Sequence, residues 1–164
     1  MPNWCENTLI INGDTTTLEE LKSIIDSDEE GLLQAIRPLV GDEAATEAWG
    51  TKWDVSSEGL DYVDNGDGTS TIQGYFHSAW SPPVEAFQAL ADDWDSCYIE
   101  LRYFEPGMGF AGEWSSETGD HHYDEIEDKL ETTQEEDPIL HSLIEDFGCD
   151  DWFEPLEDEQ DETA

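Results

Sequence analysis

Basic side chains are scarce in this sequence. Of its 164 residues, only 5 are Lys or Arg, against 43 Asp or Glu, and the formal net charge is −38. Nucleic-acid binding depends mainly on Lys and Arg contacts to phosphate groups, so the composition excludes a protein that binds nucleic acid directly. Docking onto anionic membranes is excluded for the same reason.

Long apolar runs and cysteine pairs are also missing. No run of about 18 apolar residues occurs, so no transmembrane helix is expected. The N-terminal MPNWCENTLIING has neither a basic region nor a long apolar run, which argues against a signal peptide. Cys5, Cys97 and Cys149 are odd in number and widely spaced, which favours buried free thiols in a reducing, cytoplasmic setting over a disulfide framework.

Large aromatic side chains are nevertheless plentiful, with 7 Trp, 5 Tyr and 6 Phe. A disordered acidic chain has few such residues, because it cannot bury enough apolar surface to fold. These side chains are sufficient to form a hydrophobic core, so we expect a folded domain.

The hydrophobic pattern predicts an α+β domain. Alternating apolar and polar residues indicate strands, and apolar residues at helical spacing indicate helices. The predicted elements are strand 4–12, helix 18–27, strands 53–63 and 69–80, helix 82–94 and strand 97–105. This β-α-β-β-α-β order is that of the ferredoxin-like fold, an antiparallel sheet with two helices on one face.

Local signals predict where these elements begin and turn. Thr17 followed by Glu20 fits a capping box at the start of the first helix. Ser81 and Pro82 fit a capping hydroxyl and a first-turn proline at the start of the second helix. The Asn-Gly-Asp-Gly segment at 65–68 predicts a tight turn between the second and third strands.

The remaining segments are expected to extend this core. Residues 28–52 are interpreted as an insertion within a ferredoxin-like domain that covers residues 1–126. A hairpin around residues 117–120 would widen the sheet. Residues 127–156 are expected to form an acidic connector and an amphipathic helix, and residues 157–164 a disordered acidic tail.

Four strings of unusual composition occur in order along the chain: MPNWC at the N-terminus, WGTKWD at 49–54, AWSPP at 79–83 and EPGMGFAG at 105–112. Together they resemble the YubB-type ferredoxin-like domain family, whose members are encoded by phages and plasmids and have no established biochemical function. The resemblance covers roughly residues 1–126. It implies a ferredoxin-like fold and an accessory protein of a mobile element, and it implies no activity.

The tryptophan-containing strings supply most of the candidate binding residues. Lys52 lies between Trp49 and Trp53 in a chain with very few Lys. It is interpreted either as part of a recognition surface or as a structural cation that lies over an indole ring or pairs with Asp54. The candidate binding residues are Trp4, Trp49, Lys52, Trp53, Asp54, Trp80, Ser81, Pro82, Trp152 and Phe153.

The aromatic residues near the C-terminus have two interpretations. An apolar stripe after Asp137, followed by Trp152 and Phe153, fits a helix that packs back on the sheet. The same pattern fits an amphipathic helix that binds a partner through aromatic anchors.

No cofactor or metal site is predicted. Residues 107–112 match the glycine spacing of a dinucleotide-binding loop, but no helical pattern follows them. The acidic run 61–67 fits no register of a calcium-binding loop. His121 and His122 are neighbours in a predicted strand and point to opposite faces, so they cannot readily hold one metal ion. No catalytic pair stands out among the 43 carboxylates. The sequence therefore leaves enzymatic activity undecided and favours a protein that is not an enzyme.

The charge leaves two interpretations open. An acidic surface can imitate the phosphates of nucleic acid and block a basic host nucleic-acid-binding protein. It can also keep a protein hydrated in a high-salt cytoplasm, as in halophilic organisms. We predict a non-enzymatic accessory protein that binds a protein partner. The alternative is a small-ligand-binding or enzymatic module, which a deep pocket beside Trp53 and Trp80 would favour.

Overall fold

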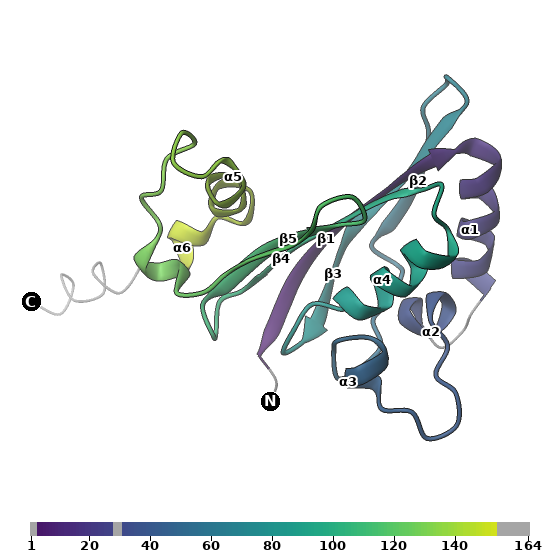
Figure 1. The fold of residues 1–164 in the computed structure, drawn as a ribbon, viewed down its shortest axis with the longest axis horizontal. Helices are drawn as coiled ribbons and strands as arrows, with labels where there is room; N and C mark the ends of the chain where they lie inside the picture. Colours follow the sequence, from purple (N-terminus) through teal and green to yellow (C-terminus); the bar gives the residue numbers. More distant parts are fainter. Residues whose placement is uncertain (1–2, 28–30, 154–164) are drawn as a thin grey trace, which may run out of the picture.

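The computed structural model describes residues 3–27 and 31–153 (Figure 1). The elements in chain order are β1 (Trp4–Asp14), α1 (Thr15–Ser27), α2 (Leu32–Ile36), α3 (Ala45–Ala48), β2 (Leu60–Asp64), β3 (Thr69–Ala79), α4 (Val84–Asp93), β4 (Tyr98–Glu105), β5 (Phe110–Ser115), β6 (Gly119–Tyr123), the 3-10 helix η1 (Ile126–Asp128), α5 (Pro138–Phe147) and α6 (Cys149–Phe153). No helix in the described ranges is long and apolar enough to cross a membrane.

The strands form one antiparallel sheet of six, in the order β2-β3-β1-β4-β5-β6. The part β2-β3-β1-β4 has the ferredoxin-like arrangement, because α1 and α4 each carry the chain over one face between non-adjacent strands. The predicted α+β ferredoxin-like fold is therefore confirmed. The predicted hairpin, β5 and β6, extends the sheet beyond β4.

The main hydrophobic core lies between the sheet and the layer of α1, α2 and α4 (Figure 1). Alternation along β1 determines which side chains enter it: Leu9 and Ile11 are fully buried, whereas Ile10 points to the other face. Leu9 lies opposite Leu101 of β4, which is also buried in this core. The sheet therefore contributes every second residue of its central strands to one continuous core.

A smaller hydrophobic cluster lies on the opposite face of the sheet. Phe104 follows Leu101 by three residues in β4 and so points to the other side. Phe104 and Ala111 meet Leu143 of α5 and Cys149 of α6 there. Figure 1 shows α5 and α6 on the far side of the sheet from α1 and α4. The predicted C-terminal helix thus packs back on the sheet, mainly against β4 and β5.

Arg102 connects this C-terminal unit to the sheet. Its guanidinium donates to the Ser142 hydroxyl at 2.6 Å and forms an ion pair with Asp146, both on α5. Its Nε lies 3.2 Å from a Glu113 oxygen of β5, close enough for an ion pair but not aligned for a hydrogen bond. One side chain therefore joins β4, β5 and α5.

Element boundaries differ from the predicted ones at three places. Helix α1 begins at Thr15, ahead of the predicted cap, and the Thr15 hydroxyl bonds that of Ser70 at 2.9 Å. Ser81 does not cap α4: its hydroxyl donates to the Gly50 carbonyl at 2.5 Å, and α4 begins at Val84. Strand β2 covers only Leu60–Asp64, because the residues after Trp53 form a loop.

The segment predicted to be an insertion is part of the core. Leu32, Leu33 and Ile36 of α2 are buried in it, and so is Trp49. The short apolar run recognised in the sequence therefore completes the helix layer. The predicted acidic tail, 157–164, lies outside the described residues.

Candidate functional site

Three half-exposed tryptophans lie near the start of β1. Trp4 and Trp53 are 45% and 46% exposed, and their ring centroids lie 6.2 Å apart. The Lys52 ammonium lies 5.2 Å from the centre of the Trp53 ring, which is a cation–π contact. Trp80, 43% exposed, adjoins them through its backbone N–H, which donates to the carbonyl of Asn3 at 2.8 Å. We call Trp4, Lys52, Trp53 and Trp80 the tryptophan patch.

The backbone of Trp80 is strained. Its φ of 73° lies in the left-handed region, which costs a non-glycine residue about 1 kcal/mol. Neighbouring bonds hold this turn in place: the Thr51 hydroxyl donates to the Ala79 carbonyl at 2.8 Å, and the Ser78 hydroxyl donates to the Ser81 carbonyl at 2.6 Å. The loop before β2 and the end of β3 therefore fix Trp80 in an exposed position.

Two of the predicted binding residues, Trp49 and Asp54, make hydrogen bonds within the fold. Trp49 is 5% exposed, and its indole N–H donates to the Arg37 carbonyl at 2.7 Å. The Asp54 carboxylate accepts from the backbone N–H groups of Leu33 and Gln34, at 2.7 and 3.1 Å, and so caps α2. Asp54 therefore faces α2, and Lys52 lies over the Trp53 ring.

Ser81 and Pro82 lie beside the patch without extending its exposed surface. Pro82 is buried, and the Ser81 hydroxyl is bonded within the turn. Both residues shape the segment that presents Trp80.

Trp152 and Phe153 lie on a different element, α6, which packs beside β4. Their ring centroids lie 6.2 and 6.4 Å from that of Phe104, in edge-on geometry. Phe153 therefore packs against the smaller hydrophobic cluster, and Trp152 touches the Phe104 ring while it remains 54% exposed.

A polar network that the sequence analysis missed lies on β4, β5 and β6. The Tyr103 hydroxyl donates to Asp120 at 2.7 Å and lies 3.0 Å from Nδ1 of His122, whose Nε2 lies 3.1 Å from Asp124. A Cβ atom on Gly112 would lie 2.2 Å from the Tyr103 hydroxyl, so only glycine leaves room for it. The signal was present in the sequence, because Asp120 and His122 are two apart in a strand and share a face.

The hydrogen bond from Tyr103 to Asp120 has a structural role. Burial, followed by the bond to Asp120, raises the pKa of Tyr103 far above its ordinary value. The phenol therefore stays protonated and donates. No group of three or more His, Cys, Asp or Glu in the described ranges is placed to hold a metal ion.

The glycine-rich segment at 107–112 forms the turn between β4 and β5 and the first residues of β5. The buried Glu105 carboxylate accepts from the N–H groups of Gly107 and Met108, at 2.9 and 2.6 Å. A strand follows this turn, where a dinucleotide-binding loop needs a helix. Its amide groups are thus already occupied by the protein's own carboxylate.

All three cysteines are free and buried. Burial raises the pKa of Cys5 and Cys97, and that of Cys149 to about 12. The thiols are therefore protonated and unreactive at neutral pH.

Most of the scarce cations are paired with acids inside the protein. Lys22 bonds Asp26 at 2.7 Å, and Arg37 bonds Glu43 at 2.5 Å, which lowers the pKa of Glu43. Lys52 forms no ion pair within 4.0 Å with another described residue. Its ammonium group lies over the Trp53 ring, so the tryptophan patch carries a positive charge that no carboxylate of the described residues neutralises at that distance. The acidic side chains themselves are spread over the helix layer, the sheet edges and the C-terminal unit.

The hollows on the described surface include four of about 610, 290, 250 and 280 Å³. None of these four is lined by a tryptophan. A deep pocket beside Trp53 and Trp80, which would favour a small-molecule site, is therefore not one of these four hollows.

One family profile agrees with the ferredoxin-like fold. The family profile described as "Ferredoxin-like domain in Api92-like protein" matches residues 48–142. A crystal structure of a protein api92 from Yersinia pseudotuberculosis is 22% identical over 48% of this chain and 28% of that chain, with a TM-score of 0.36. No curated protein matches the chain. The YubB-type grouping stays a prediction, and with more than half of its residues matched, the chain belongs to the family of the ferredoxin-like domain in Api92-like proteins.

Proposed function

We propose that the chain is a non-enzymatic module that binds a basic protein partner, with the tryptophan patch as its anchor. The observation that carries this proposal is the contact between Trp4 and Trp53, whose rings stay about half exposed. Tryptophan is among the residues most enriched at the centres of protein interfaces, because it buries a large rigid surface at low entropic cost. Trp80, held exposed at the expense of backbone strain, adds to the same surface.

The charge determines the kind of partner. A net charge of −38 attracts basic proteins over long distances and repels acidic ones. Association with a basic partner is therefore fast at low salt and slower as salt screens the field. A host nucleic-acid-binding protein fits this chemistry, and it fits the mobile-element role that the YubB-type resemblance implies.

Mimicry of nucleic acid is a narrower form of the same proposal. It requires that the chain and duplex DNA compete for one basic groove on the partner. The spread of carboxylates over every part of the described fold favours solvation over a mimicking band. Competition by DNA is therefore treated as an outcome of the test.

The test begins with capture of proteins from host lysate on the tagged chain, in dilute buffer and at about 0.5 M salt. Each captured protein is then purified, and its affinity is measured against the wild type, Trp53→Ala and Trp152→Ala. Trp152 is the matched control, because it is an exposed tryptophan on a different element. Polylysine serves as a ligand that reports charge alone.

We expect Trp53→Ala to weaken binding of the partner at least tenfold while polylysine binds as before, since the substitution leaves the charge unchanged. Displacement of the chain by duplex DNA would support mimicry. Equal losses for Trp53→Ala and Trp152→Ala would contradict the patch as the anchor. Absence of any basic partner, together with folding only in molar salt, would show that the charge serves solvation.

A further inference from the structure

Strand β2 is an edge of the sheet and pairs only with β3. Two hydrogen bonds show which residues of β2 direct their backbone groups toward β3. The N–H of Asn65 donates to the Thr69 carbonyl at 3.0 Å, and the N–H of Tyr75 donates to the Gly59 carbonyl at 3.4 Å. In an antiparallel pair, hydrogen-bonded and non-bonded residues alternate along each strand. The odd-numbered residues from 59 to 65 therefore bond toward β3.

The even-numbered residues of β2 then direct their peptide groups away from the sheet. Asp61 and Val63 face β3 with their N–H and C=O groups, whereas Tyr62 and Asp64 present theirs at the free edge. Such a row of unpaired backbone groups is a template for another strand. The strand has no proline and no lysine, two residues that commonly block edges.

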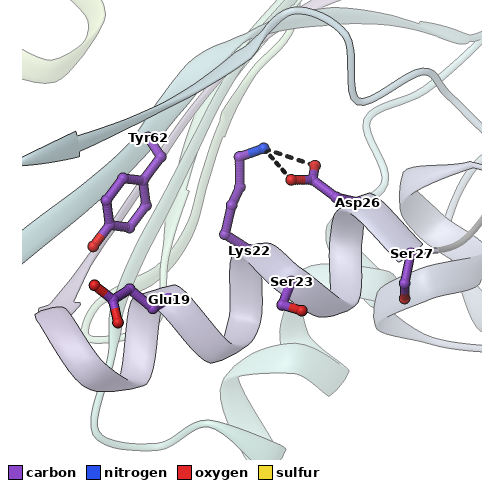
Figure 2. A pocket seen from close by; sticks show the side chains of 6 residues that line it. All are labelled: Glu19, Lys22, Ser23, Asp26, Ser27 and Tyr62. Atoms are coloured by element: carbon purple, nitrogen blue, oxygen red, sulfur yellow. Dashed lines mark hydrogen bonds and ion pairs between the residues drawn. The ribbon is translucent and has the colours of Figure 1, made fainter.

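A hollow of about 610 Å³ lies beside this edge (Figure 2). Tyr62 of β2 forms one side, and its hydroxyl is fixed by a 2.9 Å bond to Ser70. The other side is one flank of α1, formed by Glu19, Lys22, Ser23, Asp26 and Ser27. Figure 2 shows open space between the Tyr62 ring and this flank. Side chains of a strand added to β2 would enter the hollow from alternate positions.

The charges around the hollow select a basic occupant. Lys22 bonds both oxygens of Asp26, at 2.7 and 2.9 Å, so its positive charge is neutralised. Glu19 remains on the flank, and Asp61 and Asp64 lie on the strand itself. A second copy of this acidic chain would be repelled, whereas Lys or Arg side chains would be attracted.

We propose that β2 and the flank of α1 form a docking groove for an extended basic segment of the partner. The segment adds to the free edge of β2 and places alternate side chains in the hollow, a mode of recognition known as strand addition. This inference rests on the proposed function and names a second contact surface of the same complex. Backbone bonds at Tyr62 and Asp64 supply the attachment, and the carboxylates supply the preference for basic sequences.

The first experiment measures hydrogen exchange of individual amides in the full chain, with and without a peptide of alternating Lys and Val. We expect the Tyr62 and Asp64 amides to exchange at least tenfold more slowly with the peptide, and amides of the other edge strand, β6, to be unchanged. A peptide of alternating Glu and Val is the control, and it should slow the exchange of neither the Tyr62 amide nor the Asp64 amide. Equal protection at both edges, or none at Tyr62 and Asp64, would overturn the proposal.

The second experiment compares Asp64→Pro with Asp64→Ala. Both remove the carboxylate, but only proline removes the outward N–H, and neither removes a bond to β3. We expect the Lys-Val peptide to bind Asp64→Pro about tenfold more weakly than Asp64→Ala. Equal affinities would contradict strand addition. If Asp64→Pro does not fold, the exchange experiment decides alone.

The two proposals fail in different ways. A partner that still binds through Trp53, with unprotected Tyr62 and Asp64 amides, would remove the groove and leave the proposed function standing. Suppose instead that the peptide protects the Tyr62 and Asp64 amides, while Trp53→Ala leaves the affinity for the partner unchanged. The groove would then stand, and the tryptophan patch would be removed as the anchor.

Discussion

The two faces of the sheet carry hydrophobic clusters of different size and construction. The face toward α1, α2 and α4 buries a continuous core that draws on β1 to β5. The opposite face buries a small cluster at the β4–β5–β6 end of the sheet, beneath α5 and α6, and Arg102 reinforces it with ion pairs. The larger core therefore determines whether the domain folds, and the smaller cluster determines whether the C-terminal unit stays attached.

The largest expected effect comes from the main core. Leu101 is fully buried in it, so Leu101→Ala should lower the free energy of unfolding by about 3 kcal/mol. Urea denaturation followed by fluorescence measures this change. Hydrogen exchange should accelerate throughout the sheet, and a loss confined to α5 would contradict the division into two clusters.

The matched substitution in the smaller cluster is Leu143→Ala. Leu143 is also fully buried, and its loss should cost about 2 kcal/mol, because fewer neighbours surround it. We expect amides of α5 to exchange faster while those of β1 stay protected. Equal acceleration in both would show that the two clusters unfold as one.

Arg102 gives a prediction with a pH dependence. The pKa of Glu113 is raised by burial and then by Glu100, while Arg102 lowers it. Arg102→Met should destabilise the C-terminal unit by about 1–3 kcal/mol and raise the pKa of Glu113 further.

A carboxyl whose pKa is higher when folded binds more protons in the native state, so stability falls as pH rises through that pKa. Arg102→Met should therefore recover part of its lost stability as pH falls from neutral toward the raised pKa of Glu113. Arg102→Lys, which keeps the charge, should recover less. Parallel stability curves for wild type and Arg102→Met would contradict this role.

Salt should affect the whole chain more weakly. With a net charge of −38, self-repulsion destabilises the folded state when it is unscreened. We expect the melting temperature to rise from dilute buffer to about 1 M salt, where the Debye length is about 3 Å. A melting temperature that ignores salt over this range would contradict the expectation.

The smallest expected effect lies outside both clusters, at Trp80. Trp80→Gly removes the cost of the left-handed φ of 73° but adds freedom to the unfolded chain, so stability should change by less than about 1 kcal/mol. Trp80→Val keeps the cost and should destabilise by about 1–2 kcal/mol. Denaturation midpoints of the two variants measure the difference, and equal losses would show that packing of the indole dominates.

Much of the fold was predictable because it depends on local patterns. Alternation in β1, β3 and β4 determined the strands and their buried faces, and Asp137, Pro138 and Gly148 bounded α5 as residue preferences require. Helix starts were less predictable. Ser81 has the chemistry of a cap but bonds Gly50, a residue distant in sequence.

The candidate site depends on contacts between distant segments, so the sequence alone could not separate its exposed tryptophans from the buried one. The sequence gives no sign that Trp49 and Trp53 differ. In the structure, Trp49 is buried in the core and Trp53 is exposed beside Trp4. Asp54 caps a helix about twenty residues earlier in the chain, a pairing that no local pattern encodes. The Tyr103 network was missed because Asp120 and His122 share one strand, β6, whereas Tyr103 lies on β4.

The close approach of Tyr103 to Gly112 constrains how this sequence can diverge. A Cβ at position 112 would lie 2.2 Å from the Tyr103 hydroxyl oxygen, 2.3 Å from its Cζ atom and 2.8 Å from the backbone carbonyl oxygen of His121. Loss of the hydroxyl alone leaves the Cζ atom in place, and loss of the whole ring leaves the backbone carbonyl of the neighbouring strand. Relatives that keep this pairing of β5 with β6 should therefore keep glycine at position 112 even where position 103 has changed and Asp120 has lost its phenol partner.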